Sequence, residues 1–262
     1  MVEYGWMIDL TKCIGCRSCQ VACKRWNNRS AEKTTFSSTW TNPESLSPQT
    51  WTIVKFKLKH DKGTDKIDWH FIKWQCMHCD DAPCLNACPT KAIYKRPDGI
   101  VRTHDDRCIG CGNCVMACPY EVRHKDPVAG TATFKCDLCW DRVGEGKLPA
   151  CTQACPTETL VFGTRDSIVA KAKARAATIG GYIYGLWPER NLANTVVYVS
   201  KVPFEKLGFP DLNMRLSASA EVQRDLALPI GGLGVVGAAG LVALAFILRR
   251  RRELEKTSGV EK

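Results

Sequence analysis

The chain has sixteen cysteines in 262 residues, and their spacing limits what it can fold into more than any other feature. They form four groups, which we number one to four in chain order. Each opens with CxxC and closes with CxxxC. Cysteines this close in sequence are poorly placed to cross-link distant segments by disulfides, but they can surround a metal centre. The groups are Cys13, Cys16, Cys19 and Cys23; Cys76, Cys79, Cys84 and Cys88; Cys108, Cys111, Cys114 and Cys118; and Cys136, Cys139, Cys151 and Cys155.

The compact run CxxCxxCxxxCP is typical of bacterial two-cluster ferredoxins, in which the fourth cysteine binds the other cluster. Group three matches this run through Pro119, and group one matches except that Lys24 replaces the proline. Groups two and four have longer central spacers but keep the CxxxCP end. Three cysteines on a loop can bind three corners of a cubic cluster, while the helical turn that follows directs the fourth away. The sequence therefore predicts four 4Fe-4S clusters as cofactors.

Cross-ligation joins the groups in pairs. Proximity in sequence and symmetry of the fold favour pairing group two with group three, and group one with group four. The cluster that each fourth cysteine binds is assigned by analogy with two-cluster ferredoxins. The expected ligands are Cys13, Cys16, Cys19 and Cys155 for cluster A; Cys136, Cys139, Cys151 and Cys23 for cluster B; Cys76, Cys79, Cys84 and Cys118 for cluster C; and Cys108, Cys111, Cys114 and Cys88 for cluster D.

Zinc is the main alternative, since separate CxxC pairs can build four-thiolate zinc sites. Two CxxCxxCxxxC runs are denser than zinc ribbons require, which disfavours a non-redox zinc module. The formal charge of +10 invites a nucleic-acid partner. Four clusters with their thiolates would supply roughly −8, so the loaded chain would be near neutral. No nucleic-acid partner is therefore expected.

No pattern in the chain indicates that it transforms a substrate. It has no P-loop, no GxGxxG between a strand and a helix, and no nucleophile elbow. No catalytic residue is therefore assigned. Of the residues beside the cysteines, Trp26 and Trp140 are expected to shield clusters from water, and His78 to pack or lie at the surface rather than act on a cluster.

Short helical turns and hairpins are expected around the cysteines. Two short apolar runs flank the turn sequence at 97–99 and predict a β-hairpin. Each closing CxxxC fits one helical turn, which Pro89, Pro119 and Pro156 end in three of the groups. This alternation predicts an α+β fold.

The remaining segments are expected to cover the clusters and dock partners. The insertion at residues 24–75 contains a strand-like alternation at 51–58. Residues 166–177 have a helical pattern, and residues 195–199 have the pattern of a strand.

Residues 226–248 contain no charged side chain and predict a membrane-spanning helix, since they would extend about 34 Å as a helix. A buried helix and a cleaved sorting tail are the alternatives. Arg249–Arg252 follow directly. Basic residues favour the cytoplasmic side, so we expect a chain anchored in the inner membrane of a bacterium, with its tail in the cytoplasm and its cysteine domain in the periplasm. The first residues lack the pattern of a signal peptide, so export while bound to a partner is expected.

The four groups in this order resemble the beta subunits of membrane-bound molybdopterin oxidoreductases, and are most similar to the formate dehydrogenase-N type. The resemblance rests on the group-one motif with Trp26-Asn27 after it, on residues 42–52 of the insertion, and on the CMHC and KCDLCWDRV motifs of groups two and four. Nitrate reductase beta subunits replace one cysteine with tryptophan, whereas all sixteen positions here are cysteine.

The resemblance implies two pseudo-symmetric ferredoxin-like halves with two clusters each, and one C-terminal transmembrane helix. It implies a catalytic alpha subunit with a molybdenum or tungsten pterin, which would carry the export signal, and a membrane gamma subunit, often a cytochrome b. Electrons from formate would pass through the clusters to haem and quinone in anaerobic respiration. A subunit of a membrane hydrogenase, or of another molybdopterin oxidoreductase, is the alternative.

These expectations divide the chain into four parts. They are a four-cluster ferredoxin-like domain at 1–165 that includes the insertion 24–75, a peripheral cap or docking segment at 166–225, the transmembrane helix at 226–248, and a cytoplasmic tail at 249–262.

Overall fold

The computed structural model describes residues 2–61, 66–126, 133–187 and 192–211. All four cysteine groups lie within these residues. No helix in this part of the chain is long and apolar enough to cross a membrane. The predicted span at 226–248 and the tail at 249–262 lie outside the described residues.

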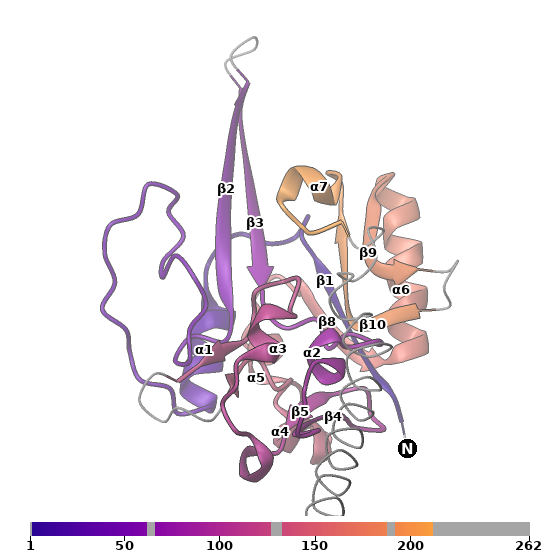
Figure 1. Ribbon diagram of the computed structural model, residues 1–262. Helices are drawn as coiled ribbons and strands as arrows, with labels where there is room; N and C mark the ends of the chain where they lie inside the picture. Colours follow the sequence, from indigo (N-terminus) through magenta and orange to yellow (C-terminus); the bar gives the residue numbers. More distant parts are fainter. Residues whose placement is uncertain (1, 62–65, 127–132, 188–191, 212–262) are drawn as a thin grey trace, which may run out of the picture. The chain divides into compact units, whose positions relative to one another are not determined.

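A four-stranded sheet organises the described fold, with the strand order β8-β1-β10-β9 (Figure 1). Strand β1 (Tyr4–Asp9) pairs parallel to β10 (Leu192–Ser200) and antiparallel to β8 (Leu160–Thr164). Strand β9 (Tyr182–Trp187) pairs antiparallel to β10. The two inner strands therefore come from opposite ends of the described chain.

The two faces of this sheet have different partners. Met7, Val197 and Val199 point to one face and pack against α6 (Arg165–Ile179), through residues such as Ile168. The neighbours of these residues along β1 and β10 point to the opposite face, because side chains alternate along a strand. That face carries Trp6, Ile8, Val196 and Tyr198, which share a buried core with Cys76, Cys136 and Cys151. The sheet thus separates the covering helix from the cysteines.

Four expected elements are confirmed. The hairpin around 97–99 consists of β4 (Ile93–Lys95) and β5 (Val101–Thr103). The pattern at 51–58 belongs mostly to β2 (Ile53–Asp61), which pairs with β3 (Lys66–Trp74) in a long hairpin that extends away from the sheet (Figure 1). The patterns at 166–177 and 195–199 lie in α6 and β10.

The described part of the segment expected as a peripheral cap has a more central place. Strand β10 lies between β1 and β9, and Val196, Val197, Tyr198 and Val199 are all buried. An apolar run without alternation is typical of a strand that is covered on both faces. Part of residues 166–225 therefore completes the sheet instead of lying only on its surface.

The closing CxxxC segments form short helices. In groups two, three and four these are α2 (Pro83–Asn86), α3 (Asn113–Met116) and α5 (Ala150–Gln153), and each ends before the CP dipeptide, because the residue before proline avoids the helical conformation. In group one, Lys24 takes the place of proline and α1 (Ser18–Trp26) continues. The remaining short elements are η1 (Asp105–Arg107), α4 (Trp140–Gly144), α7 (Phe204–Leu207), and the paired strands β6 (His124–Lys125) and β7 (Thr133–Phe134).

Candidate metal centres

The helices that close the groups pack in the pairs that cross-ligation predicts. Helix α1 of group one packs against α5 of group four, and α2 of group two packs against α3 of group three. All sixteen cysteines are free thiols, and most are buried or half-buried. Only Cys16 and Cys111 are exposed. The thiols therefore lie inside two paired modules, where metal could be held away from water.

In the module of groups two and three, two small cavities each bring four cysteines together. The first is lined by Cys76, Cys79 and Cys84 of group two and by Cys118 of group three. The second has the reciprocal composition and is lined by Cys108, Cys111, Cys114 and Cys88. These are the residues expected for clusters C and D, and we name the two positions sites C and D.

In the module of groups one and four, the cysteines that raise one another's pKa indicate the same exchange of fourth cysteines. Cys155 is close enough to Cys13 that its charge contributes to raising the pKa of the Cys13 thiol, an increase that comes mainly from burial. Burial also raises the pKa of Cys23, and the cysteines that add to this effect are Cys136, Cys151 and Cys139 of group four. The fourth cysteines therefore lie beside the opposite groups, at positions that we name sites A and B. Ligation itself stays a prediction.

The described cysteines can be compared with the ligand sets of a single zinc ion and of a 4Fe-4S cluster. Within the described ranges, no three His, Cys, Asp or Glu side chains come close enough together to hold a single metal ion. Sulfurs around one zinc lie about 3.8 Å apart, because each Zn–S bond is about 2.3 Å. A cubic 4Fe-4S cluster separates its thiolates further, since each one binds a different iron. Each site brings together four cysteines, which is the number of ligands that a 4Fe-4S cluster takes.

All four CxxC loops share one backbone feature that the sequence did not reveal. The residue before the second cysteine has a positive φ in every group: 69° at Gly15, 46° at His78, 66° at Gly110 and 58° at Leu138. Glycine adopts this left-handed conformation freely, whereas histidine and leucine adopt it at a cost. His78 and Leu138 are fully buried, so packing holds them in place. The repeat of CxxC in sequence is thus also a repeat of loop conformation.

The buried thiols need a cation in order to ionise. Burial raises the pKa of Cys136 to about 12, although the Lys73 ammonium acts in the opposite direction. Burial also raises the pKa of Cys118 to about 11. Thiols with such values stay protonated at neutral pH, whereas iron is bound by the thiolate. Deprotonation is therefore favoured only together with metal binding.

Each module also contains a buried cation that the sequence analysis did not single out. Lys73 and Arg123 are both only 1% exposed. Burial would lower the pKa of each, but neighbouring cysteines raise it: Cys151 and Cys19 for Lys73, and Cys84 and Cys114 for Arg123. Arg123 also lines the cavity of site C. Buried charge is tolerated when an opposite charge is close, and cysteine-bound clusters are anionic.

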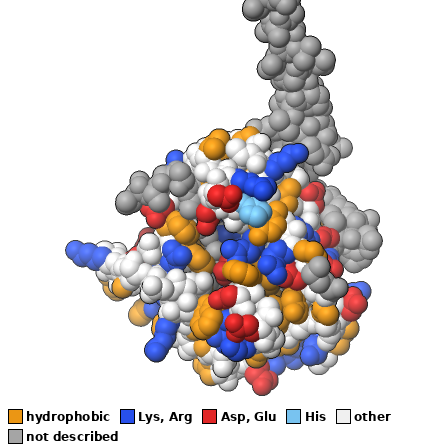
Figure 2. Space-filling view, turned by 90° about the horizontal axis from the view of Figure 1, so that it is seen from below, with side chains coloured by type: hydrophobic (Ala, Val, Ile, Leu, Met, Phe, Trp, Pro, Cys, Tyr) orange, Lys and Arg blue, Asp and Glu red, His pale blue; other side chains and the backbone are white. Residues whose placement is uncertain are grey.

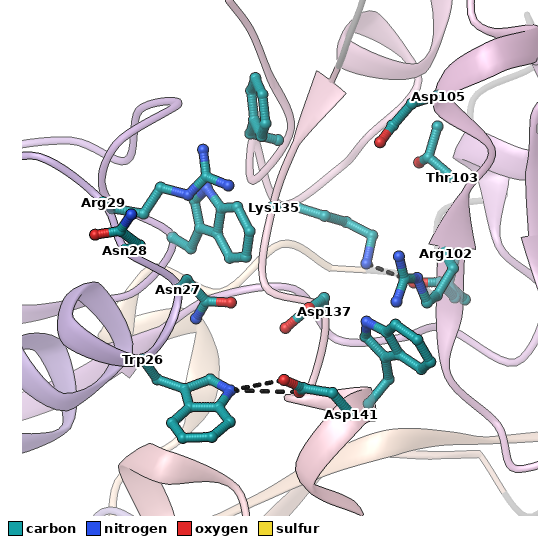
Figure 3. A pocket seen from close by; sticks show the side chains of 14 residues that line it. Trp26, Asn27, Asn28, Arg29, Arg102, Thr103, Asp105, Lys135, Asp137 and Asp141 are labelled. Carbon is teal, nitrogen blue, oxygen red and sulfur yellow. Dashed lines mark hydrogen bonds between the residues drawn. The ribbon is translucent and has the colours of Figure 1, made fainter. Parts of the chain in front are cut away.

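A larger pocket of about 400 Å³ lies beside the group-four loop (Figure 3). In it, Trp26 of α1 donates hydrogen bonds from Nε1 to both carboxylate oxygens of Asp141, at 3.3 and 3.1 Å. Arg102 stacks over Trp140, with its guanidinium carbon 4.2 Å from the ring centroid. Trp26 and Trp140 are 42% and 38% exposed. Both side chains line this pocket, and Trp26 links α1 of group one to α4 of group four. That they shield clusters from water stays a prediction.

His78 was expected either to pack or to lie at the surface, and it is fully buried. Its Nδ1 accepts a hydrogen bond of 3.0 Å from the backbone N–H of Val101 in strand β5. Burial lowers the pKa of His78 well below its usual value, and the nearby Lys135 and Arg123 add to this effect. The neutral ring therefore ties the group-two loop to the β4–β5 hairpin, which is the packing role among the expected alternatives.

The aromatic side chains of the β2–β3 hairpin cover the group-one loop. Phe56 and Phe71 contact each other edge to face, with ring centroids 5.0 Å apart. A Cβ added to Gly15 would lie 2.9 Å from Cδ1 of Phe71 and 3.1 Å from Cζ of Phe56. Part of the insertion 24–75 thus packs directly on a ligand loop, as expected for a covering segment.

Gly15→Ala is expected to reduce iron occupancy at site A and to lower the apparent melting temperature. The added methyl group meets Phe71 and must also adopt a positive φ, which costs about 1 kcal/mol or more. Gly112→Ala is the matched control, because Gly112 also has a positive φ, of 83°, but has open space around it. Iron analysis and thermal melts of both variants test this; equal losses would show that contact with the hairpin is unimportant.

Charges of both signs are mixed on the surface shown in Figure 2, where Lys and Arg side chains lie among acidic and hydrophobic ones.

The CxxC loops of groups one and three each expose a hydrophobic side chain. Ile14 and Ile109 follow the first cysteines of groups one and three, and they are 58% and 64% exposed. Sites A and D therefore each reach the surface beside an apolar side chain.

Comparison with known proteins supports this reading of the cysteines. Residues 12–92 and 67–165 each match a 4Fe-4S dicluster domain. The nitrate-inducible formate dehydrogenase iron-sulfur subunit of Escherichia coli K12 is 35% identical over 92% of this chain and 81% of its own length. The formate dehydrogenase iron-sulfur subunit of Haemophilus influenzae is 34% identical over 91% of this chain and 78% of its own. The hydrogenase-2 operon protein HybA of E. coli O157:H7 is 36% identical over 76% and 63%. The chain therefore belongs to the family of formate dehydrogenase-type iron–sulfur subunits, electron-transfer proteins built from 4Fe-4S dicluster domains.

Proposed function

We propose that this chain carries electrons through four 4Fe-4S clusters, from the molybdenum or tungsten pterin subunit of a formate dehydrogenase to a membrane cytochrome b that reduces quinone. The observation that carries the proposal is the convergence of the cysteines in four sets that exchange their fourth members. When bound, the clusters would accept and release single electrons. The sixteen proposed ligands are those of sites A to D.

The arrangement of the sites supports a path through the protein. Cys136 of site B lies close enough to Cys76 of site C for their charges to interact, and both are buried. Sites B and C would therefore be the inner pair. The exposed cysteines, Cys16 and Cys111, belong to sites A and D. The proposed order is A, B, C, D, in which each outer site faces one partner subunit.

A hydrogenase-linked function is the second candidate, favoured by the similarity to HybA. This chain spans 63% of HybA but 81% of the E. coli formate dehydrogenase subunit. Agreement along more of the length supports a formate dehydrogenase as the first choice. In either case the substrate is handled by another subunit, and this chain supplies thiolate ligands and the buried surroundings that set cluster potentials.

Purification of the chain from native membranes in mild detergent, without oxygen, tests this function. We expect about 16 iron atoms and as much acid-labile sulfide per chain. Mass spectrometry of the co-purifying proteins should find a pterin-containing formate dehydrogenase and a cytochrome b. If a hydrogenase co-purifies instead, the hydrogenase-linked function replaces the formate dehydrogenase function. If the chain contains zinc and no acid-labile sulfide, both functions are overturned.

We further propose that the chain is anchored in a bacterial inner membrane, with the cysteine domain in the periplasm and the C-terminus in the cytoplasm. The uncharged stretch 226–248 followed by Arg249–Arg252 supports this orientation. Export would occur with the catalytic partner. A protease added to spheroplasts should cleave the cysteine domain; protection of that domain would place it in the cytoplasm.

Truncation after residue 225 is expected to make the chain extractable from membranes by alkaline carbonate without changing its iron content. The truncated chain keeps every cysteine but loses the apolar stretch 226–248, whose burial in lipid would hold the full chain in the bilayer. The full-length chain treated in parallel is the control. Equal extraction of the two chains would contradict an anchor in this segment.

A further inference from the structure

Lys73 is a fully buried lysine near the end of strand β3, three residues before the first cysteine of group two. Its neighbours in sequence, Ile72 and Trp74, are buried as well. Burying an ammonium in a protein core is costly unless an opposite charge or several hydrogen bonds compensate it. The position of Lys73 therefore requires a specific explanation.

A network of polar side chains holds the ammonium of Lys73 in place. Its Nζ donates hydrogen bonds to Oγ1 of Thr52 at 2.8 Å and to Oε1 of Gln75 at 2.9 Å. Nε2 of Gln75 donates to the Tyr198 hydroxyl at 3.0 Å, and this hydroxyl donates to the backbone carbonyl of Lys73 at 2.7 Å. The ring of Trp6 lies 4.5 Å from Nζ. A flexible side chain is thus fixed in one direction.

No carboxylate compensates this charge among the residues that the structure describes, since Lys73 takes part in none of their ion pairs. Its hydrogen-bond acceptors, Thr52 and Gln75, are neutral. Trp6 and Tyr198, which contact Lys73, share one buried core with cysteines of both sites: Cys19 and Cys155 of site A, and Cys136 and Cys151 of site B. Burial would lower the pKa of Lys73, and the groups that raise it are Cys151, Cys19, Cys136 and Cys23, which carry negative charge as iron-bound thiolates. The ammonium therefore lies where its charge acts on both sites.

We propose that Lys73 is a positioning residue whose fixed positive charge raises the reduction potentials of the clusters at sites A and B. The inference rests on the proposed function, because it needs clusters at these sites. Adding an electron makes a cluster more negative, and a nearby cation stabilises that form. The interior screens this interaction less than water does, so one charge acts strongly on both sites.

The charge can be removed while much of the polar network is kept. Lys73→Gln leaves an amide that can hydrogen-bond to Thr52, and Lys73→Met leaves an apolar chain of similar length. Lys73→Arg keeps the charge. Lys55→Met is the matched control: Lys55 lies on the paired strand β2, 3.8 Å from the Trp74 ring, and no cysteine contributes to its pKa, which burial lowers.

Redox titration of the purified complex, followed by electron paramagnetic resonance, measures the result. Signals of sites A and B are assigned by their loss in Cys16→Ala and Cys23→Ala. We expect Lys73→Gln and Lys73→Met to lower the equilibrium constant for reduction at these sites at least tenfold, or about 59 mV for one electron. Sites C and D should change much less, and Lys73→Arg and Lys55→Met should resemble the wild type.

Two results would overturn the inference. One is an unchanged potential in Lys73→Gln that still contains all of its iron. The other is an equal shift in Lys73→Arg and Lys73→Gln, which would mean that the shape of the side chain matters rather than its charge. If Lys73→Met does not accumulate, Lys73→Gln and Lys73→Arg decide. Failure of the proposed function is distinguishable, because the wild-type protein would then lack iron and acid-labile sulfide.

Discussion

Replacing Cys23 with alanine is expected to remove the cluster of group four and to leave that of group one in place. Cys23 belongs to group one in sequence, but its side chain is buried beside Cys136, Cys139 and Cys151. A cluster at site B would lose one of its four thiolates. Because site B is an inner position of the proposed path, electron transfer from formate to quinone should fall below one hundredth of the wild-type rate.

The iron content of double variants shows which cysteines serve the same cluster. The wild-type chain should hold about 16 iron atoms, and a single ligand variant about 12. Cys23→Ala combined with Cys136→Ala should still hold about 12, because both residues would serve site B. Cys23→Ala combined with Cys16→Ala should hold about 8, because Cys16 belongs to site A. Non-additive losses identify a shared cluster.

The opposite pattern would disprove cross-ligation. If the Cys23 and Cys16 variants together lost no more iron than either alone, group one would hold its own cluster. The structure offers a second pair for the same comparison: Cys155→Ala should combine with Cys13→Ala without further loss, since Cys155 lies beside Cys13. Folding of each variant is checked by recovery of the iron that remains.

The grouping of cysteines could be predicted from sequence, because short spacers fix which thiols reach one centre. Group three shows this most directly, since its three closely spaced cysteines line the cavity of site D. Its fourth cysteine lies at site C, and the exchange follows from the helical turn α3, which ends at Met116, before Cys118 and Pro119. Local geometry determines such features, so the sequence reveals them.

Features that depend on distant contacts could not be predicted in this way. The parallel pairing of β1 with β10 joins residues 4–9 to residues 192–200, and no local pattern indicates it. Lys73 lies in a strand-like stretch, where a lysine normally faces water. Its burial becomes visible only when β3 packs near Trp6 and Tyr198. Tertiary packing, rather than the local sequence, gives this lysine its buried place beside Trp6 and Tyr198.

The positive φ of His78 and Leu138 has a similar origin. Glycine at the same position in groups one and three suggests a special conformation, but histidine and leucine do not. The core around these two side chains holds them there, since both are buried. The conformational repeat is therefore visible in sequence in only two of the four groups.

Trp6→Ala is expected to destabilise the folded chain by about 3–5 kcal/mol, the usual cost of removing a buried aromatic side chain. Trp6 is fully buried on the inner strand β1, where it pairs with Val196 on one side and Phe162 on the other. The same change removes the ring that faces the Lys73 ammonium. The apparent melting temperature of the loaded protein, measured at one scan rate without oxygen, should fall by roughly 6–20 °C.

Two controls separate burial from the loss of an aromatic ring in general. Phe36→Ala removes a ring that is 93% exposed, and such surface changes usually stay within about 0.5 kcal/mol. Trp6→Phe keeps an aromatic face toward Lys73 and should lose less than Trp6→Ala, because Nε1 of Trp6 makes no hydrogen bond to any described residue. Similar melting temperatures for Trp6→Ala and Phe36→Ala would show that β1 is not central to the core. A large loss in Trp6→Ala alone would show that the buried ring on β1 stabilises the sheet that joins the two ends of the described chain.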